Sequence, residues 1–170
     1  MRTPHLQTRA GARAGFVFIC PGRFEASRGF PCAAGTGANL ARALIRLHAR
    51  LPARFAAPDR AAYVITNSWE SVEYPALTGR SVPSEAEVLT DGNLNRLAAE
   101  LSGLETVVAC GAQAQAAVRA LVDRGQTVAD IAFARHLSQR SVNMIPGGSD
   151  TTGRIERWCD GVLGQLPPRP

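Results

Sequence analysis

Two polar side chains in this 170-residue sequence directly follow short apolar runs. His136 comes after Ile131 to Arg135, and an imidazole can donate a hydrogen bond or carry a proton near neutral pH. Asn67 comes after Tyr63 to Thr66, and its amide offers a donor and an acceptor to a base edge or an amide-like ligand. The structural alternatives are a histidine that caps a loop and an asparagine that starts a turn.

Carboxylates occur in the long segments that follow the first two apolar runs. Glu25, Glu70 and Glu73 are the candidates there, and any of them can orient a water molecule. The alternative is that they are solvated loop residues. We take Glu25 and Glu70, together with His136, as the catalytic candidates.

The apolar runs predict buried strands, because they do not alternate with polar residues. Helical patterns lie between them, and strands that alternate with helices predict an α/β fold. We expect a three-layer α/β/α sandwich with a central four-stranded parallel sheet, in one domain over residues 15–166. The expected strands are Phe16 to Cys20, Tyr63 to Thr66, Thr106 to Cys110 and Ile131 to Arg135.

Four helices are expected from apolar spacing and capping residues. The first has Thr36 as its N-cap, and Ser84 with Glu87 has capping-box spacing for a short turn before the second. Gly125 is a suitable residue to follow the end of the third. The helical stretches are "TGANLARALIRLHARL", Asp91 to Leu101, "GAQAQAAVRALVDRG" and "RIERWCDGVLGQL".

In a parallel sheet the carboxyl ends of the strands share one edge, where ligands bind. The first strand leads into about fifteen residues of Gly, Pro, Arg and small side chains, although such connections usually take about 2–6 residues. The second and fourth strands also end in unusual segments, whereas the third turns at once into a helix. We therefore expect the site at this edge.

The charge indicates a possible class of partner. The net charge is +5, and all 19 basic residues are arginine. Genome composition alone can produce this bias, but arginine also makes bidentate contacts with phosphate. A basic domain is consistent with a nucleic-acid partner.

The sequence contains no pattern for a metal or a nucleotide cofactor. The four cysteines form no C-x-x-C pair, so we expect free thiols and no metal centre. Without lysine the chain cannot form the usual P-loop, and "GTGANL" does not complete G-x-G-x-x-G. We expect no cofactor.

The ends of the chain are expected to lie outside the domain. Residues 1–14 are predicted to be a flexible Arg-rich arm and residues 167–170 a tail. No run approaches about 18 apolar residues, and no secretory h-region follows the arm. We expect a cytoplasmic monomer that does not enter a membrane.

These segments, taken in order, resemble the uracil-DNA glycosylase superfamily. Its members have a strand, a Pro-Gly turn and a G-x-P-hydrophobic-x-G-x-x-G segment that opens a helix. The stretch "CPGRFEASRGFPCAAGTGANL" supplies the corresponding Pro21, Gly22, Gly29, Pro31 and Gly37.

Three later segments extend the resemblance over about residues 16–160. Thr66-Asn67 matches an asparagine that ends the next strand, and "VVACGAQAQAAV" matches a strand that enters a helix through Gly-Ala. The stretch "HLSQRSVN" matches a His-Pro-Ser-like turn and is most similar to the branch of single-strand-selective monofunctional enzymes.

The resemblance implies a DNA glycosylase that removes uracil or another deaminated base, with DNA as its partner. His136 would donate to the carbonyl oxygen of the leaving base, and Asn67 would read the Watson–Crick edge. The base pocket would involve Ile19, Cys20, Pro21, Gly22, Phe30 and Cys32. Contacts with DNA would involve Ser138, Arg140, Asn143, Arg23 and Arg28.

Some positions depart from the family pattern. Many members carry Asp, Glu or Asn where this chain has Ile19, and an aromatic residue where it has Cys32. Leu137 replaces the proline of His-Pro-Ser. These departures leave two alternatives open: a nucleic-acid or base-binding protein without catalysis, and a hydrolase of small nucleotides or nucleosides.

Overall fold

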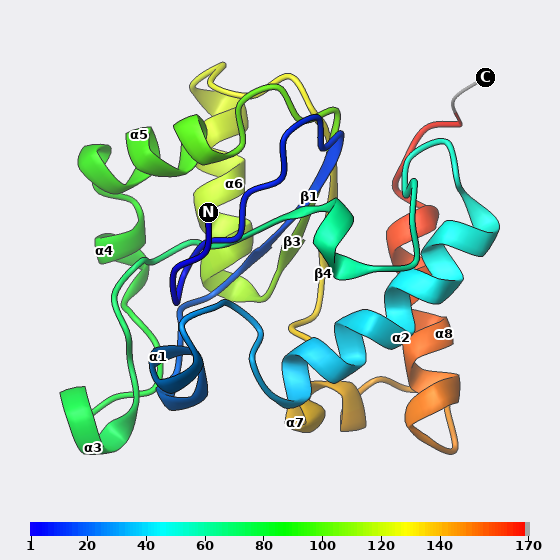
Figure 1. Cartoon of the computed structure of the whole chain (residues 1–170), viewed down its shortest axis with the longest axis horizontal. Coiled ribbons are helices and arrows are strands. Elements are labelled where there is room, and N and C mark those ends of the chain that lie inside the picture. Colours follow the sequence, from blue (N-terminus) through cyan, green and yellow to red (C-terminus); the bar gives the residue numbers. More distant parts are fainter. Residues whose placement is uncertain (169–170) are drawn as a thin grey trace.

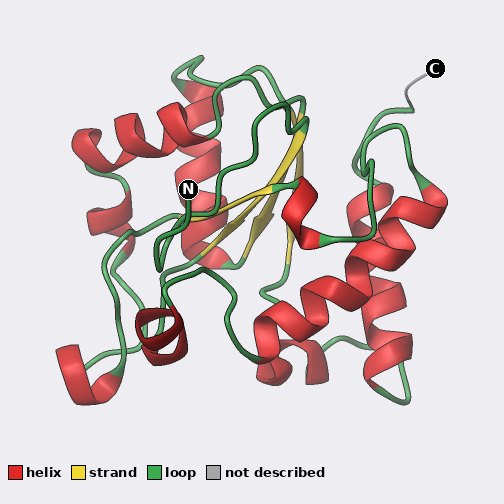
Figure 2. Cartoon of the chain, viewed as in Figure 1, coloured by secondary structure: helices red, strands yellow, loops and turns green. Residues whose placement is uncertain are grey.

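A parallel sheet of four strands forms the centre of the protein. The computed structural model describes residues 1–168, and the strand order is β2-β1-β3-β4. All three neighbouring pairs are parallel. Figures 1 and 2 show the sheet between two groups of helices. The strands are β1 (Ala14–Phe18), β2 (Val64–Asn67), β3 (Thr106–Cys110) and β4 (Asp130–Ala134).

The helices cover both faces of this sheet. One core cluster joins Phe16 and Phe18 of β1 to α2 and α8, and a second joins Val17 to α5 and α6. Successive strand residues point to opposite faces, so β1 supplies both cores. This arrangement confirms the predicted α/β class and parallel sheet. The helices are α1 (Arg23–Arg28), α2 (Gly35–Arg50), η1 (Arg60–Ala62), α3 (Pro75–Thr78), α4 (Glu85–Val88), α5 (Asp91–Glu100), α6 (Ala112–Asp123), α7 (Gln139–Asn143) and α8 (Thr151–Leu163).

Most elements lie close to their predicted ranges. β3 matches its prediction, and α4 has the expected capping box of Ser84 and Glu87. β1 lies two residues earlier than predicted, because Ile19 and Cys20 belong to the connection that follows it. The connection also contains a helix of its own, α1, which the composition did not reveal. Thr36 is not the N-cap of α2; Ala34 takes that position.

The amino-terminal segment packs against the sheet. The main chain of Gln7 exchanges hydrogen bonds of 2.8 and 3.0 Å with Ile65 of β2. Leu6 and Gln7 are buried. The segment predicted to be a flexible arm therefore covers the outer edge of β2 at these residues, where an uncovered strand would expose unpaired main-chain groups.

One buried arginine joins distant parts of the chain at the amino edge of the sheet. Arg54 follows α2, and its side chain is only 1% exposed. It donates to Thr106 Oγ1 at 3.0 Å, to Asp130 Oδ2 at 2.8 Å and to the carbonyl oxygen of Pro167. The start of β3, the start of β4 and the end of the domain therefore share one charged group.

Within residues 1–168, no helix combines the length and the apolar character that crossing a membrane requires.

The Arg54→Met substitution should lower the free energy of unfolding by about 3 kcal/mol, because it removes the hydrogen bonds of a buried cation to Thr106, Asp130 and Pro167. The matched control is Arg50→Met, which breaks an exposed ion pair with Asp160 and should cost less than about 1 kcal/mol. Urea denaturation of both variants measures the difference. Equal losses of unfolding free energy in the two variants would show that the buried bonds of Arg54 stabilise the fold no more than an exposed ion pair does.

Candidate active site

A cavity lies at the carboxyl edge of the sheet, where the sequence placed the site. Its volume is about 190 Å³. A cavity of about 150 Å³ can hold a benzene ring, so this one has room for a single planar ring. The lining residues come from β1, β2, the β1–α2 connection, α2 and the segment after β4: Phe18, Cys20, Gly22, Glu25, Cys32, Thr36, Asn67 and His136.

The strand register brings the two principal polar residues to this edge. Phe18 pairs with Asn67 at the ends of β1 and β2. β4 ends at Ala134, two residues before His136. The rings of His136 and Phe18 pack in a T-shaped arrangement, with an interplanar angle of 82° and the ring centroids 5.5 Å apart. The position of the imidazole is therefore fixed by the last residue of the central strand.

Hydrogen bonding determines which nitrogen of His136 carries the proton. The main-chain N–H of Ser138 donates to His136 Nδ1 at 3.0 Å. This bond requires a lone pair on Nδ1, so a neutral ring carries its proton on Nε2. Within residues 1–168, Nε2 has no hydrogen-bond partner, and its N–H is left for a ligand in the cavity.

Burial keeps this ring neutral. Removal from water lowers the pKa of His136 from 6.5 to about 4, and the negative charge of Glu25 opposes the shift only in part. At neutral pH the side chain is therefore a hydrogen-bond donor through Nε2 without a net charge.

Asn67 is held from two directions. Its side-chain Nδ2 donates to the carbonyl oxygen of His5 at 3.1 Å, and its main-chain carbonyl oxygen accepts from Arg96 at 3.0 Å. Arg96 in turn contacts Glu100, which also accepts from Thr66 of β2. The amino-terminal segment therefore orients the amide of Asn67, a residue that lines the cavity, and α5 supports its main chain.

Glu25 clamps the connection between β1 and α2. Its Oε2 accepts from the main-chain N–H of Gly22, and its Oε1 accepts from that of Ala33, both at 3.0 Å. The carboxylate therefore spans the connection and also lines the cavity. Each oxygen keeps a further lone pair for a water molecule.

The far wall of the cavity is tightly built around Cys32. Cys32 has a φ of 51°, an unusual value for a residue other than glycine. A Cβ at Gly37 would collide with its carbonyl oxygen, so only glycine fits there. Arg60 donates to the carbonyl oxygens of Cys32 and Pro31 at 2.9 and 2.6 Å. The connection is thus fixed by hydrogen bonds at both ends.

Cys20, one of the two cysteines that line the cavity, is a weak nucleophile. Burial, aided by the carboxylates of Glu73 and Glu25, raises the pKa of the Cys20 thiol to about 12. Cys20 therefore stays protonated near neutral pH and contributes size and polarity, not a thiolate.

Several predicted site residues lie outside the lining of the cavity. Ile19 places its side chain where Gly111 comes close, and Pro21 is buried with its carbonyl oxygen bonded to the N–H of Glu73. Glu70 is exposed. The guanidinium carbons of Arg2 and Arg60 lie 5.9 and 5.5 Å from the ring centroid of Phe30.

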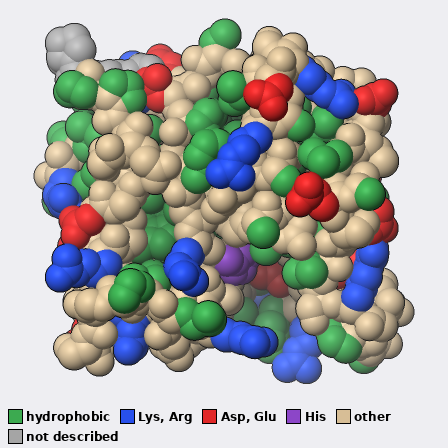
Figure 3. All heavy atoms as spheres, turned by 180° about the vertical axis from the view of Figure 1, so that it is seen from behind, with side chains coloured by type: hydrophobic (Ala, Val, Ile, Leu, Met, Phe, Trp, Pro, Cys, Tyr) green, Lys and Arg blue, Asp and Glu red, His purple; other side chains and the backbone are tan. Residues whose placement is uncertain are grey.

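The residues predicted to contact DNA are distributed over α1 and α7. Arg140 and Asn143 are exposed on α7, and Ser138 is its N-cap. Arg23 and Arg28 are exposed on α1. On the face shown in Figure 3, arginine side chains surround a hollow in which a histidine and acidic side chains are visible.

Phe18 and Thr36 line the cavity but were not predicted to do so. Phe18 was expected to be an interior strand residue, yet it is the last residue of β1. Thr36 was expected to cap α2, yet it lies within the first turn. That Phe18 and Thr36 line the cavity follows only from where β1 ends and where α2 begins.

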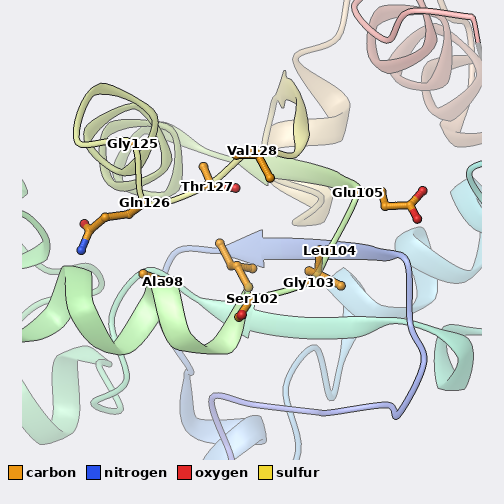
Figure 4. Close-up of a pocket in the computed structure, with 10 residues that line it drawn as sticks. Ala98, Ser102, Gly103, Leu104, Glu105, Gly125, Gln126, Thr127 and Val128 are labelled. Atoms are coloured by element: carbon orange, nitrogen blue, oxygen red, sulfur yellow. The ribbon is translucent and has the colours of Figure 1, made fainter.

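A second cavity, of about 350 Å³, lies at the opposite edge of the sheet. The segments before β3 and β4 line it, and Figure 4 shows the carboxylate of Glu105 directed away from the other lining residues. Glu105 pairs with Arg13 at 2.6 Å. This cavity lacks a set of groups for acid–base chemistry.

No protein-family model matches the chain, and a search of curated proteins gives no significant match. Within residues 1–168, no group of three or more His, Cys, Asp or Glu side chains is placed to hold a metal ion.

The tautomer of His136 can be measured directly. Nitrogen-15 spectra of the imidazoles should show Nε2–H for His136 and a midpoint near pH 4. Since the pKa is below that of the unfolded chain, the stabilisation is complete above about pH 6.5 and is lost as the pH falls towards 4. Between these pH values, wild type should lose on the order of 2 kcal/mol more stability than His136→Gln. A midpoint near 6.5 would contradict the assignment.

The Glu25→Ala substitution should free the main-chain amides of Gly22 and Ala33 and lower the free energy of unfolding by about 2 kcal/mol. Hydrogen exchange at these two amides measures the local effect. The control is Glu70→Ala, which removes an exposed carboxylate from a neighbouring segment and should change neither amide. Unchanged protection of the Gly22 and Ala33 amides in Glu25→Ala would show that Glu25 does not hold this segment in place.

Proposed function

We propose that the protein is a monofunctional DNA glycosylase that hydrolyses the N-glycosidic bond of uracil or another deaminated base. The observation that carries this proposal is the neutral His136, whose Nε2–H is left for the same cavity that Asn67 and Glu25 line. The ordered motifs and the arginine-rich surface also support it, as an outlying member of the uracil-DNA glycosylase superfamily.

The reaction breaks the bond between the sugar C1′ and the base nitrogen, and the base leaves with the electron pair. Negative charge then develops on its carbonyl oxygen. The Nε2–H of His136 donates to that oxygen, so the stabilisation grows as the bond breaks. A neutral imidazole suits this step, because a hydrogen bond from its Nε2–H stabilises the negative charge on the base without transfer of the proton.

The sugar becomes cationic as the base departs. Glu25 is the carboxylate in the cavity, and its negative charge favours the cationic sugar. Its remaining lone pairs can orient the water that adds to C1′ and accept the proton that this water loses, and the departed base anion takes up a proton from solvent. In this assignment Glu25 takes the part that a carboxylate at the position of Ile19 takes in many family members.

The target base must leave the stack to reach the cavity, because a base within a duplex is inaccessible. In the proposed complex the amide of Asn67 reads the base edge. The exposed Arg140 and Asn143 on α7, with Ser138, contact the strand on one side of the cavity, and Arg23 and Arg28 on α1 contact it on the other.

A second candidate is a nucleic-acid or base-binding protein on the same fold without hydrolysis. The apolar Ile19 favours it, because its side chain comes close to Gly111 and supplies no group for water. This candidate predicts binding to DNA without release of a base.

Labelled oligonucleotides that contain one uracil, hypoxanthine or xanthine distinguish these functions. Incubation with the protein followed by alkali should give strand scission with one of them. His136→Gln and Asn67→Ala should each lower the rate about 100-fold or more. The matched controls are His48→Gln on α2 and Asn95→Ala on α5, both outside the cavity, which should retain the wild-type rate.

The pattern of outcomes decides between the candidates. Binding without scission on every substrate would favour the non-catalytic protein. Hydrolysis of free nucleosides but not of oligonucleotides would favour a small-nucleoside hydrolase. Scission that His136→Gln retains would refute the proposed role of this residue.

A further inference from the structure

An aromatic side chain is exposed next to the mouth of the cavity. Phe24 is 42% exposed, and it is the one aromatic residue within residues 1–168 that is classed as exposed. It lies on α1 between Gly22 and Glu25, both of which line the cavity. An exposed phenyl ring beside a cavity offers a flat apolar surface on which the ring of a ligand can stack.

Two arginines accompany this ring. The guanidinium carbon of Arg23 lies 4.6 Å from the centroid of Phe24, and that of Arg28 lies 5.9 Å away. Phe24 and Arg28 are one helical turn apart and share a face of α1. Seven arginines within residues 1–168 form ion pairs with carboxylates, and Arg23 and Arg28 are not among them. Arg28 also donates to the carbonyl oxygen of Ala33.

A ring beside these two cations fits a strand of nucleic acid whose bases are unpaired. Such a base stacks on an exposed aromatic side chain, and its phosphates lie near the arginines. Bases within a duplex already stack on their neighbours and leave no face for Phe24. The same geometry does not favour an acidic peptide, because carboxylates need no aromatic face.

We propose that Phe24, with Arg23 and Arg28, is a stacking platform for an unpaired base next to the flipped nucleotide, and that it gives the protein a preference for single-stranded DNA. The flipped nucleotide in this proposal rests on the proposed function. The binding test below does not require that the protein excise a base. Figure 1 shows α1 and α7 on the same side of the molecule, beyond the carboxyl ends of the strands. A strand that enters the cavity therefore passes α1 on one side.

Binding to undamaged DNA tests the platform without any base excision. Fluorescence anisotropy would use a labelled single-stranded oligonucleotide of normal bases and the matching duplex. Phe24→Ala should weaken binding to the single strand about tenfold, whereas Phe24→Trp should retain it. Binding to the duplex should change less than about twofold in both variants.

Control variants separate stacking from general surface effects. Val122→Ala removes an exposed apolar side chain of similar exposure, 44%, from the end of α6 and should leave binding unchanged. Arg23→Gln should lower the slope of log K against log salt by about 0.7 for the single strand, and Arg9→Gln, on the amino-terminal segment, should not. Far-ultraviolet circular dichroism confirms that each variant is folded.

The platform and the glycosylase function can fail separately. Single-strand binding that Phe24→Ala retains, or no single-strand binding by wild type, would overturn the platform even if bases are excised. Binding that depends on Phe24 in a protein that excises no base would support the platform and refute the glycosylase.

Discussion

The position of β1 between β2 and β3 is the constraint on which the site depends. β1 pairs with both neighbours along its length, and its last residue, Phe18, stands opposite Asn67. β4 ends at the same edge, so His136, two residues after its end, reaches the ring of Phe18. Because these strands are parallel, segments far apart in sequence must deliver their side chains to one edge. A shift in register of one residue would turn Phe18 to the other face of the sheet.

The connection after β1 depends on main-chain hydrogen bonds instead of a hydrophobic core. Glu25 holds the amides of Gly22 and Ala33, and Arg60 holds the carbonyl oxygens of Pro31 and Cys32. The carboxylate thus accepts from main-chain N–H groups of this segment, and the guanidinium donates to its main-chain carbonyl oxygens. This arrangement keeps the cavity open beside a segment that has few apolar side chains to bury.

The sequence predicted the elements that depend on local patterns. Apolar runs identified the four strands, the spacing of Ser84 and Glu87 identified the start of α4, and strand ends located His136 and Asn67. Local patterns do not show which residue of an apolar run is the last one paired, so Phe18 was not recognised as part of the site.

Other features depend on contacts between distant residues. The bond from Glu25 to Ala33 requires the finished path of the connection, and the pairing of Gln7 with Ile65 requires the assembled sheet. Composition alone therefore suggested a loose arm where the chain is buried, and it did not distinguish Glu25, which lines the cavity, from the exposed Glu70.

The bond between Asn67 and His5 also has a consequence for which base the proposed enzyme accepts. An amide anchored through its nitrogen cannot exchange its two ends, so Oδ1 is the end of Asn67 without a partner within residues 1–168. Oxygen there attracts the N–H of uracil or hypoxanthine and repels the ring-nitrogen lone pair that cytosine or adenine presents at the same place. In this scheme, a carbonyl group at the fifth residue of the chain enforces the rejection of cytosine and adenine, whereas thymine and guanine present the same N–H as uracil and hypoxanthine.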